Sequence, residues 1–578
     1  MLEVPSLSVP WAEHYARLPW ATPMGPYDLE VRLAVARGSC ASAAAIFRDR
    51  YGGAENVQSL SLLGDEGQRS HWRGVMHLST RRFAYRFRVE DEAGNACWFG
   101  ADGLAATRGE TSWFQYPYVG DGDLHAIPAW AVGAVFYQIF PDRFCNGDPS
   151  TDLPGTLPWG APPTGSSFFG GDLEGIRSQL PYLADLGVQA LYLTPIFQAN
   201  TNHRYDTTDY YRIDPPLGTE ENLRQLIDGA HNLGLRVVLD GVFNHCGAGF
   251  APFRDAVAQG RSSPYWEWFR VHGERISLDP PNYETFANRN ASMPKLLTHR
   301  VGVRRYILDV ATYWTRFGID GWRLDVANEV DHVFWRTFRE TVRSVNPDAL
   351  IIGEVWHDPT AFLDGSEFDT VMAYRWRRAI LGFVSGRKNA SAFAEEITRI
   401  RTVTPPTVEH VMMNILGSHD TERVRTHFGG DAERAMCAAG LQLTLPGMPS
   451  IYYGDEIGME GGPEHPDARR CMEWDVTHQQ VAMRERYRAL IALRKQYAAL
   501  SCGDMESVAS GHPLVYAFRR THPEGDILVA ANLGEHPWRP REDGPIRRLD
   551  EDGDVLPPRS VGLWKVDSLV GSTTDMQR

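Results

Sequence analysis

Four apolar runs that each end in polar residues constrain the fold of this chain more than any other feature. They occupy residues 235–245, 318–325, 349–354 and 411–420, and helical stretches separate them. Near-continuous apolar strands that alternate with helices are typical of a parallel sheet covered on both faces. Polar residues gathered at the C-terminal ends of such strands indicate the active face of a (β/α)₈ barrel. The sequence therefore predicts a barrel with its functional side chains at one end.

Three of these runs bring carboxylates to the predicted active face. Arg323 and Asp325 lie two residues apart and therefore on the same face of one strand. An arginine beside a carboxylate favours its ionised form, as a nucleophile requires. Glu354 and Asp420 close two further runs. One such pair alone is more often an ordinary ion pair, but two carboxylates with a third converging on them are the equipment of glycoside hydrolysis.

Together, these motifs resemble the α-amylase superfamily. The resemblance is carried by residues 240–245, 321–325, 353–354 and 418–420, in that family's order and with suitable spacings. It implies a retaining mechanism in which Asp325 is the nucleophile and Glu354 is the general acid and then the base. Asp420 would bind hydroxyls of the reacting sugar.

Nine further positions are predicted to bind substrate, and most of them follow from the same resemblance. The motif histidines would donate hydrogen bonds to the sugar, whereas Tyr205 and Trp356 can stack on sugar faces. One segment departs from the family pattern, because His465 stands where an aspartate is expected four residues before Arg469, with Glu464 inserted beside it. Donor-side binding is therefore altered or carried by Glu464. The predicted binding residues are His203, Tyr205, His245, Arg323, Trp356, His419, Glu464, His465 and Arg469.

Three short features narrow the resemblance to the branch of cyclomaltodextrinases, neopullulanases and maltogenic amylases. They are residues 293–297, residues 326–330 and Trp356. The branch implies hydrolysis of α-1,4 bonds in cyclodextrins and short maltodextrins, with some action on pullulan and starch and some transglycosylation. A transglycosylase or isomerase on the same site is one alternative. A non-catalytic carbohydrate-binding scaffold is the other.

A loop rich in oxygen donors follows the first predicted barrel strand. Hard oxygen donors on a flexible loop suit Ca²⁺, and related enzymes bind calcium with this loop plus a later glycine and aspartate. An Asx-rich turn without metal is the alternative, and Thr151 stands where asparagine is expected. The predicted ligands of a structural Ca²⁺ are Asn146, Asp148, Thr151, Asp152, Gly170 and Asp172.

Two β domains are predicted to flank the barrel. Residues 1–125 are predicted to form a β-sandwich, because residues 27–35 and 83–89 alternate apolar with polar at period two, as a half-buried sheet requires. The barrel is expected over residues 126–499, with an inserted subdomain at about 247–300 after the third strand. Residues 500–578 are predicted to form an antiparallel C-terminal β-sandwich with a frayed tail from Asp567. The resemblance of the N-terminal domain implies a homodimer.

Composition argues against several classes of partner. A formal net charge of −15 disfavours nucleic acid and anionic membranes, whereas a neutral sugar is indifferent to it. Seven cysteines without CxxC spacing disfavour a zinc site or a disulfide framework. The sequence shows neither a signal peptide nor an apolar run long enough to span a bilayer. We therefore expect a cytoplasmic protein.

Overall fold

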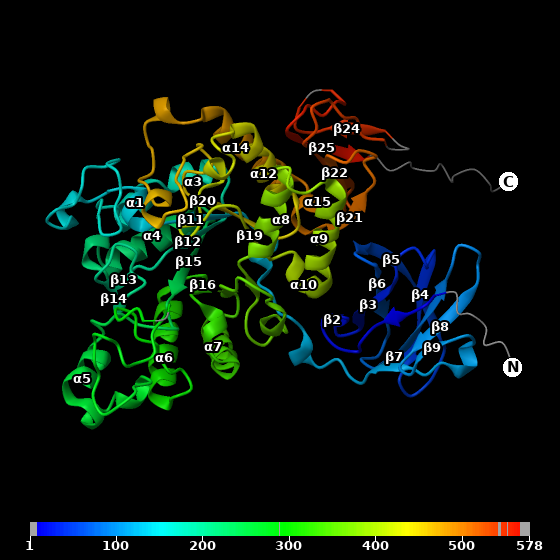
Figure 1. The fold of residues 1–578 in the computed structure, drawn as a ribbon, viewed down its shortest axis with the longest axis horizontal. Helices are drawn as coiled ribbons and strands as arrows, with labels where there is room; N and C mark the ends of the chain where they lie inside the picture. The colour runs from blue at the N-terminus through cyan, green and yellow to red at the C-terminus, as the bar shows by residue number, and fades with distance from the viewer. Residues whose placement is uncertain (1–8, 288, 542–544, 552, 567–578) are drawn as a thin grey trace.

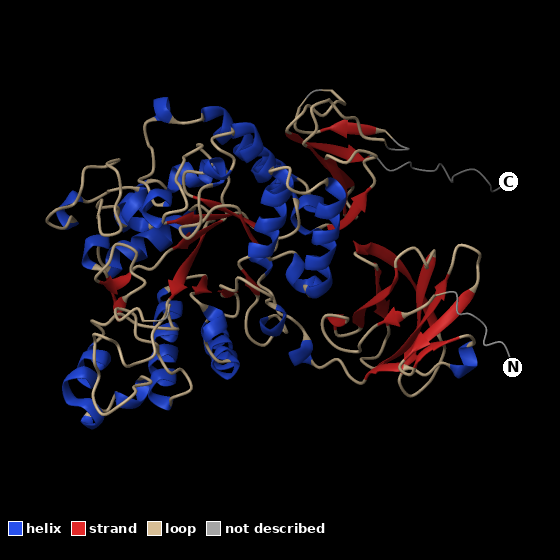
Figure 2. Cartoon of the chain, in the orientation of Figure 1, coloured by secondary structure: helices blue, strands red, loops and turns tan. Residues whose placement is uncertain are grey.

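The structure is a computed structural model that describes residues 9–287, 289–541, 545–551 and 553–566, so the predicted frayed tail lies outside it. Figure 1 shows a β domain built from the first part of the chain, a central barrel and a C-terminal sheet. Helices surround the barrel, whereas strands dominate both flanking parts (Figure 2). Within the described residues, none of the helices combines the length and apolar character needed to cross a bilayer.

Eight parallel strands form the barrel. In order around the ring they are β11 (Phe136–Ile139), β12 (Ala190–Leu193), β15 (Arg236–Gly241), β16 (Gly321–Leu324), β17 (Leu350–Gly353), β18 (Thr370–Val371), β19 (Met413–Ile415) and β20 (Met448–Tyr452). A parallel bridge between Met372 and Met413 joins β18 to β19 and closes the ring. The four apolar runs fall on β15, β16, β17 and β19, and the predicted barrel is confirmed.

Helices cover the outside of the barrel in most of the connections. They are α2 (Leu173–Ser178), α3 (Leu180–Leu186), α4 (Glu220–Asn232), α6 (Val301–Phe317), α7 (His332–Val345), α8 (Tyr374–Val384), α9 (Ala390–Val403), α12 (Ala432–Thr444) and α14 (Val481–Gln496). Residues 354–369, all described, are an exception, because they hold only a short 3-10 helix, Thr360–Phe362. The break between α2 and α3 has a local cause, since Pro181 cannot continue a helix and lies in the first turn of α3.

Residues 247–300 form a separate lobe after β15, as the fold prediction requires. The lobe contains α5 (Ala251–Gln259) and short 3-10 turns, and it lies at the lower left of Figure 1. An antiparallel bridge between His245 and Lys295 attaches the far end of the lobe to the end of β15. The lobe therefore places its own side chains beside the barrel's C-terminal face.

The N-terminal domain consists of two antiparallel layers around one apolar core. Its strands are β1 (Ala12–Glu13), β2 (Ala21–Gly25), β3 (Asp28–Ala36), β4 (Ser42–Asp49), β5 (Asn56–Glu66), β6 (Arg69–His77), β7 (Phe83–Glu90), β8 (Ala96–Gly100), β9 (Gly103–Ala105) and β10 (Phe114–Tyr116). β5 pairs with both β6 and β4 and so joins the two layers. Apolar side chains of β3 and β7 pack in the same core.

The outer face of β3 is buried, which corrects the prediction of a half-buried strand. Its polar residues Glu30 and Arg32 are each 3% exposed. The Arg32 Nη1 atom donates to the carbonyls of Arg401, Thr402 and Thr404 at 2.8, 3.2 and 2.9 Å, at the C-terminal end of α9. The polar face of the strand is therefore an interface with the barrel domain.

The C-terminal part forms one five-stranded antiparallel sheet in the order β21 (Asp504–Val508), β22 (Val515–Thr521), β23 (Asp526–Asn532), β25 (Ser560–Val566) and β24 (Ile546–Arg548). The antiparallel domain is confirmed. The described residues do not form the predicted sandwich of two sheets, because helix α12 covers one face of this sheet instead. Val561 of β25 lies directly against Gly440 of α12.

Candidate active site

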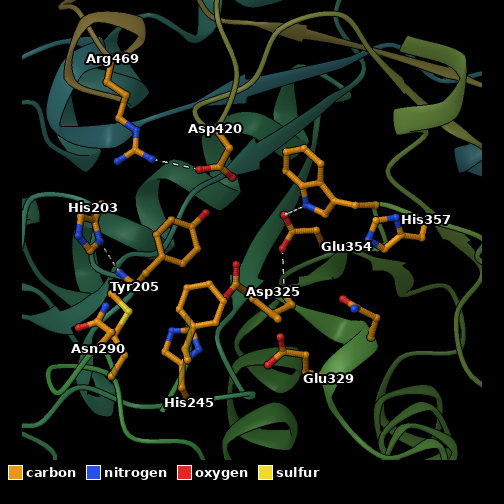
Figure 3. Close-up of a pocket in the computed structure, with 15 residues that line it drawn as sticks. His203, Tyr205, His245, Asn290, Asp325, Glu329, Glu354, His357, Asp420 and Arg469 are labelled. Carbon is orange, nitrogen blue, oxygen red and sulfur yellow. Dashed lines mark hydrogen bonds and ion pairs between the residues drawn. The ribbon is translucent and has the colours of Figure 1, made fainter. Parts of the chain in front are cut away.

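A cleft of about 600 Å³ opens where the barrel strands end. Asp325 follows β16, Glu354 follows β17 and Asp420 lies in the loop after β19, so three strand ends deliver the three carboxylates to it. Figure 3 shows these carboxylates around a common space, with Asp420 above, Glu354 to the right and Asp325 below. Eight predicted residues line the cleft: Asp325, Glu354, Asp420, His203, Tyr205, His245, Trp356 and Arg469.

Arg323 lies beneath the cleft and is fully buried. Its Nη1 atom donates to both carboxylate oxygens of Asp240 at 2.9 Å and to Oδ1 of Asp325 at 2.8 Å. Its Nη2 atom lies 2.9 Å from Oε2 of Glu354. One guanidinium is therefore shared by three carboxylates, two of which are the predicted nucleophile and acid.

The pKa of Asp325 is not low, although the sequence predicts that Arg323 favours its ionised form. Arg323 lowers the pKa of Asp325, as predicted, but burial raises it more strongly, and the neighbouring Glu354 and Asp240 raise it further. The net result is a pKa well above the ordinary value for an aspartate. Because one positive charge faces three carboxylates, the cluster favours retention of one proton.

Glu354 is held by groups on both of its oxygens. Its Oε2 accepts a hydrogen bond from the backbone N–H of Val326 at 2.9 Å, one residue after the nucleophile. Its Oε1 accepts from Nε1 of Trp356 at 2.9 Å, and the Trp356 ring stacks on Tyr374 with centroids 3.8 Å apart. These contacts restrict rotation of the carboxyl group, as an acid that must meet one oxygen of the substrate requires.

Asp420 belongs to a second group of side chains on the opposite wall. Arg469 Nη2 lies 3.1 Å from Asp420 Oδ1 (Figure 3). On the other carboxylate oxygen, His419 Nε2 lies 3.1 Å from Asp420 Oδ2. The His419 ring stacks on Tyr205 with centroids 5.3 Å apart and planes at 7°. The Tyr205 hydroxyl also donates to Asp240 at 2.9 Å. The two groups are thus connected through Asp240, a buried carboxylate of β15.

His245 presents a polar atom with no protein partner to the cleft. The side chain is fully buried, and its Nε2 has no hydrogen-bond partner among the described residues. Its ring stacks on Phe286 of the inserted lobe with centroids 4.7 Å apart. Burial lowers the pKa of His245 to about 3, and nearby Lys295 contributes in the same direction. A neutral imidazole with a free ring nitrogen can bind a sugar hydroxyl.

The sequence matches known proteins over most of its length. Residues 138–497 match the α-amylase catalytic domain, and residues 12–120 match the α-amylase N-terminal Ig-like domain. The chain belongs to the α-amylase family. It is 43% identical over 531 residues to neopullulanase 2 of Thermoactinomyces vulgaris, spanning 90% of this chain and 91% of that protein.

Two other similar proteins of the family support the same assignment. An intracellular maltogenic amylase of Bacillus subtilis is 39% identical over 489 residues, covering 83% of this chain and 82% of its own length. A solved cyclomaltodextrinase superposes with a TM-score of 0.90 at 36% identity, covering 96% of this chain and 99% of that structure. The α-amylase family is a family of glycoside hydrolases, and this chain is one of its enzymes.

Arg323 and His419 do not line the cleft themselves but contact the carboxylates Glu354 and Asp420 that do. Two further predicted binding residues are not placed in the cleft of this family member. Glu464 is exposed, precedes the short helix α13 (His465–Ala468) and is not among the residues that line the cleft. The suggestion that it carries donor-side binding is therefore not supported by the geometry. The side chain of His465 lies outside the described part of the structure, whereas Arg469 reaches Asp420.

Several lining residues escaped the sequence analysis because none of them closes an apolar run. Phe286 and Asn290 come from the inserted lobe, and His357 comes from the segment without an α-helix. Glu329 lies within residues 326–330, which served only to identify the branch. Lobe residues could have been found only through their bridge to the end of β15, which depends on tertiary structure.

The predicted calcium loop fits a cation in part. Asp172 already accepts three backbone N–H bonds, from Gly147, Asp148 and Gly175. The Asp148 side chain caps its own turn by accepting from Ser150. In the described residues, no group of three or more His, Cys, Asp or Glu side chains is arranged to hold a metal. The hydrogen bonds of Asp172 and Asp148 therefore stabilise the fold of the loop itself.

One residue of the loop, Asn146, keeps a buried oxygen without a hydrogen-bond partner. The Oδ1 atom of Asn146 is buried without a hydrogen-bond partner, while its amide nitrogen lies 3.0 Å from Asp152 Oδ1. Gly170 adopts φ +78°, and a Cβ there would lie 2.1 Å from Asp152, so only glycine permits this close approach. The Thr151 hydroxyl donates to the Pro216 carbonyl at 3.1 Å and so binds another segment of the chain.

Proposed function

We propose that this chain is a retaining hydrolase of α-1,4-glucosidic bonds in cyclodextrins and short maltodextrins, with some action on pullulan and starch. The observation that carries the proposal is the Arg323 guanidinium shared by Asp325 and Glu354. It holds a nucleophile and an acid side by side, as a double-displacement mechanism requires. The names of the similar neopullulanase, maltogenic amylase and cyclomaltodextrinase support the choice of substrates.

The proposed reaction uses the residues as the geometry arranges them. One oxygen of Asp325 bonds to the anomeric carbon while the glycosidic bond breaks and its oxygen takes the proton of Glu354. Glu354 then accepts a proton from water, whose oxygen releases the sugar from Asp325. Asp420 and the free Nε2 of His245 bind sugar hydroxyls and strengthen those contacts as the ring flattens. A sugar acceptor in place of water gives transglycosylation.

The competing functions make different predictions for the same site. A transglycosylase or isomerase would form the same intermediate on Asp325 but return it to a sugar. A non-catalytic scaffold would have no need to keep Asp325, Glu354 and Asp420 together in one cleft. That set supports the enzyme.

The experiment compares the wild type with Asp325→Asn on γ-cyclodextrin, maltotriose, pullulan and soluble starch, with product anomers followed by NMR. We expect cyclodextrin to be cleaved faster than starch, the α-anomer to appear first and the variant to lose at least about 10⁴-fold in kcat. Initial β-anomer would reject retention. Activity that survives in Asp325→Asn would reject the site.

A structural Ca²⁺ is part of the proposal. Asn146, Asp152 and Gly170 would hold it, because they offer a carboxylate and amide or carbonyl oxygens close together. Bound calcium would supply positive charge that fixes this loop at the base of the barrel's active face. Asp325 and Glu354 carry out the reaction itself.

We also propose a homodimer formed through the N-terminal domain and a cytoplasmic location. Exposed apolar side chains on that domain, including Tyr51, Val57 and Leu62 at 77%, 68% and 48% exposure, support an interface. The free cysteines and the similar intracellular maltogenic amylase support the location. A concentration-independent monomer mass in light scattering would reject the dimer.

A further inference from the structure

The turn that follows the nucleophile is strained. Val326 has φ 45° and ψ 42°, in the left-handed region that a β-branched residue rarely adopts. Such a conformation costs about 1–3 kcal/mol and persists only where the surroundings hold it. In this conformation the Val326 N–H donates to Oε2 of Glu354 at 2.9 Å. The strain therefore aims a backbone donor at the general acid.

Lys295 of the inserted lobe ties this turn to the neighbouring strand. Its ammonium group donates to the side-chain oxygen of Asn244, after the end of β15, and to the Glu329 carbonyl at 2.9 Å. The Glu329 carboxylate lies 3.7 Å from the same nitrogen. Glu329 ends the short 3-10 helix that begins one residue after Val326. One side chain thus links the lobe, the end of β15 and the loop after β16.

The position of this ammonium is itself fixed. The backbone of Lys295 pairs with that of His245, and Leu296 N–H donates to the Asn244 carbonyl at 3.0 Å. The side chain is only 14% exposed and is not among the residues that line the cleft. Trp335 provides the turn with a second attachment, because its Nε1 donates to the Ala327 carbonyl at 2.8 Å. Of these two attachments of the turn, the one made by Lys295 carries a positive charge.

We propose that Lys295 is a positioning residue for the general acid: by holding the strained turn after the nucleophile, it keeps the Val326 N–H on Glu354. The inserted lobe therefore contributes to acid catalysis without touching the reacting atoms. This inference rests on the proposed hydrolysis of α-1,4 bonds.

The test separates acid catalysis from general damage by the choice of leaving group. Maltotriose has a sugar leaving group that needs a proton from Glu354, whereas the fluoride of α-maltosyl fluoride departs with little help from an acid. Lys295→Met is expected to lose about 10²-fold in kcat on maltotriose. The loss on the fluoride should stay below about fivefold. Lys295→Arg keeps a charged donor and should recover part of the loss.

A second lysine substitution and a replacement variant serve as controls for the test of Lys295. Lys495 is exposed on α14, so Lys495→Met should behave as the wild type on both substrates. If Lys295→Met does not fold by circular dichroism, Lys295→Gln, which keeps donors without the charge, takes its place. Equal losses on both substrates, or no loss on maltotriose, would overturn the role of Lys295. A wild type that cleaves the fluoride but not maltotriose or cyclodextrin would instead overturn the proposed function.

Discussion

Arg323 sets the charge balance of the cleft. It is the shared partner of Asp240, Asp325 and Glu354, and each of these carboxylates lies within 2.9 Å of one of its nitrogens. Removal of this one side chain would leave three buried carboxylates without their cation, which is far more costly than loss of a surface ion pair. Catalysis and stability therefore depend on the same residue.

The proposed binding of Ca²⁺ beside Asn146 can be tested with single substitutions. Ca²⁺ that binds only the folded chain should stabilise it by about 2.7 kcal/mol at a hundredfold excess over Kd. We expect Ca²⁺ to raise the Tm and a chelator to lower it, as measured by calorimetry. Asp152→Asn should abolish this difference, because Asp152 is the carboxylate beside the unpartnered Oδ1 of Asn146.

The matched control is Asp148→Asn, in the same loop. Asparagine keeps the oxygen with which Asp148 caps its own turn, so this variant should leave the effect of Ca²⁺ on the Tm unchanged. A Tm that does not respond to Ca²⁺ in the wild type would contradict the metal site.

The residues that strand pattern and family motif predict are those at strand ends. Asp325, Glu354 and His245 could be found because each closes an apolar run, and tertiary structure adds only their partners. Phe286 and Lys295 act through a bridge between distant segments, which leaves no periodic signal in the sequence. Glu464 does not line the cleft, and its role stays a prediction, because sequence spacing in a loop does not fix the direction of a side chain.

At the scale of elements, burial decides how much the sequence reveals. Barrel strands buried on both faces, such as β16 and β17, appear as continuous apolar runs. β18 has only two residues and leaves no such run, although it completes the ring through Met372. In β3, apolar and polar residues do alternate, but the polar face contacts the barrel domain and not water. The periodicity of a sequence shows which side chains share a face of a strand, but it does not show whether water or another domain covers that face.

At the scale of the whole molecule, three buried neutral histidines link stability to pH. Burial lowers the pKa of His14 to about 4, that of His125 to about 4 and that of His245 to about 3. A histidine whose pKa is lower in the folded chain binds its proton more tightly after unfolding, so acid favours the unfolded chain. Each unit of pKa difference is worth about 1.4 kcal/mol.

We therefore expect full stability from these groups above pH 6.5, the ordinary pKa, and a progressive loss as the pH falls from there towards 4. Denaturant midpoints measured across this range should decrease, and His14→Gln should flatten the decrease. His231 titrates in the opposite sense, because its hydrogen bond to Asp320 raises its pKa. A His231→Gln variant should not flatten the acid slope. A midpoint that is constant between pH 6.5 and 4.5 would contradict this account.

The contact of Arg32 with α9 bears on how such a chain can be cut and recombined. Three carbonyls at the end of this barrel helix receive their donor from the N-terminal domain, and Arg73 of the same domain lies 3.3 Å from Asp504 of the C-terminal sheet. A truncated enzyme that begins at the barrel would expose a helix end adapted to a guanidinium. The N-terminal domain is thus not an interchangeable module, and an exchange with a homologue must carry both sides of this junction.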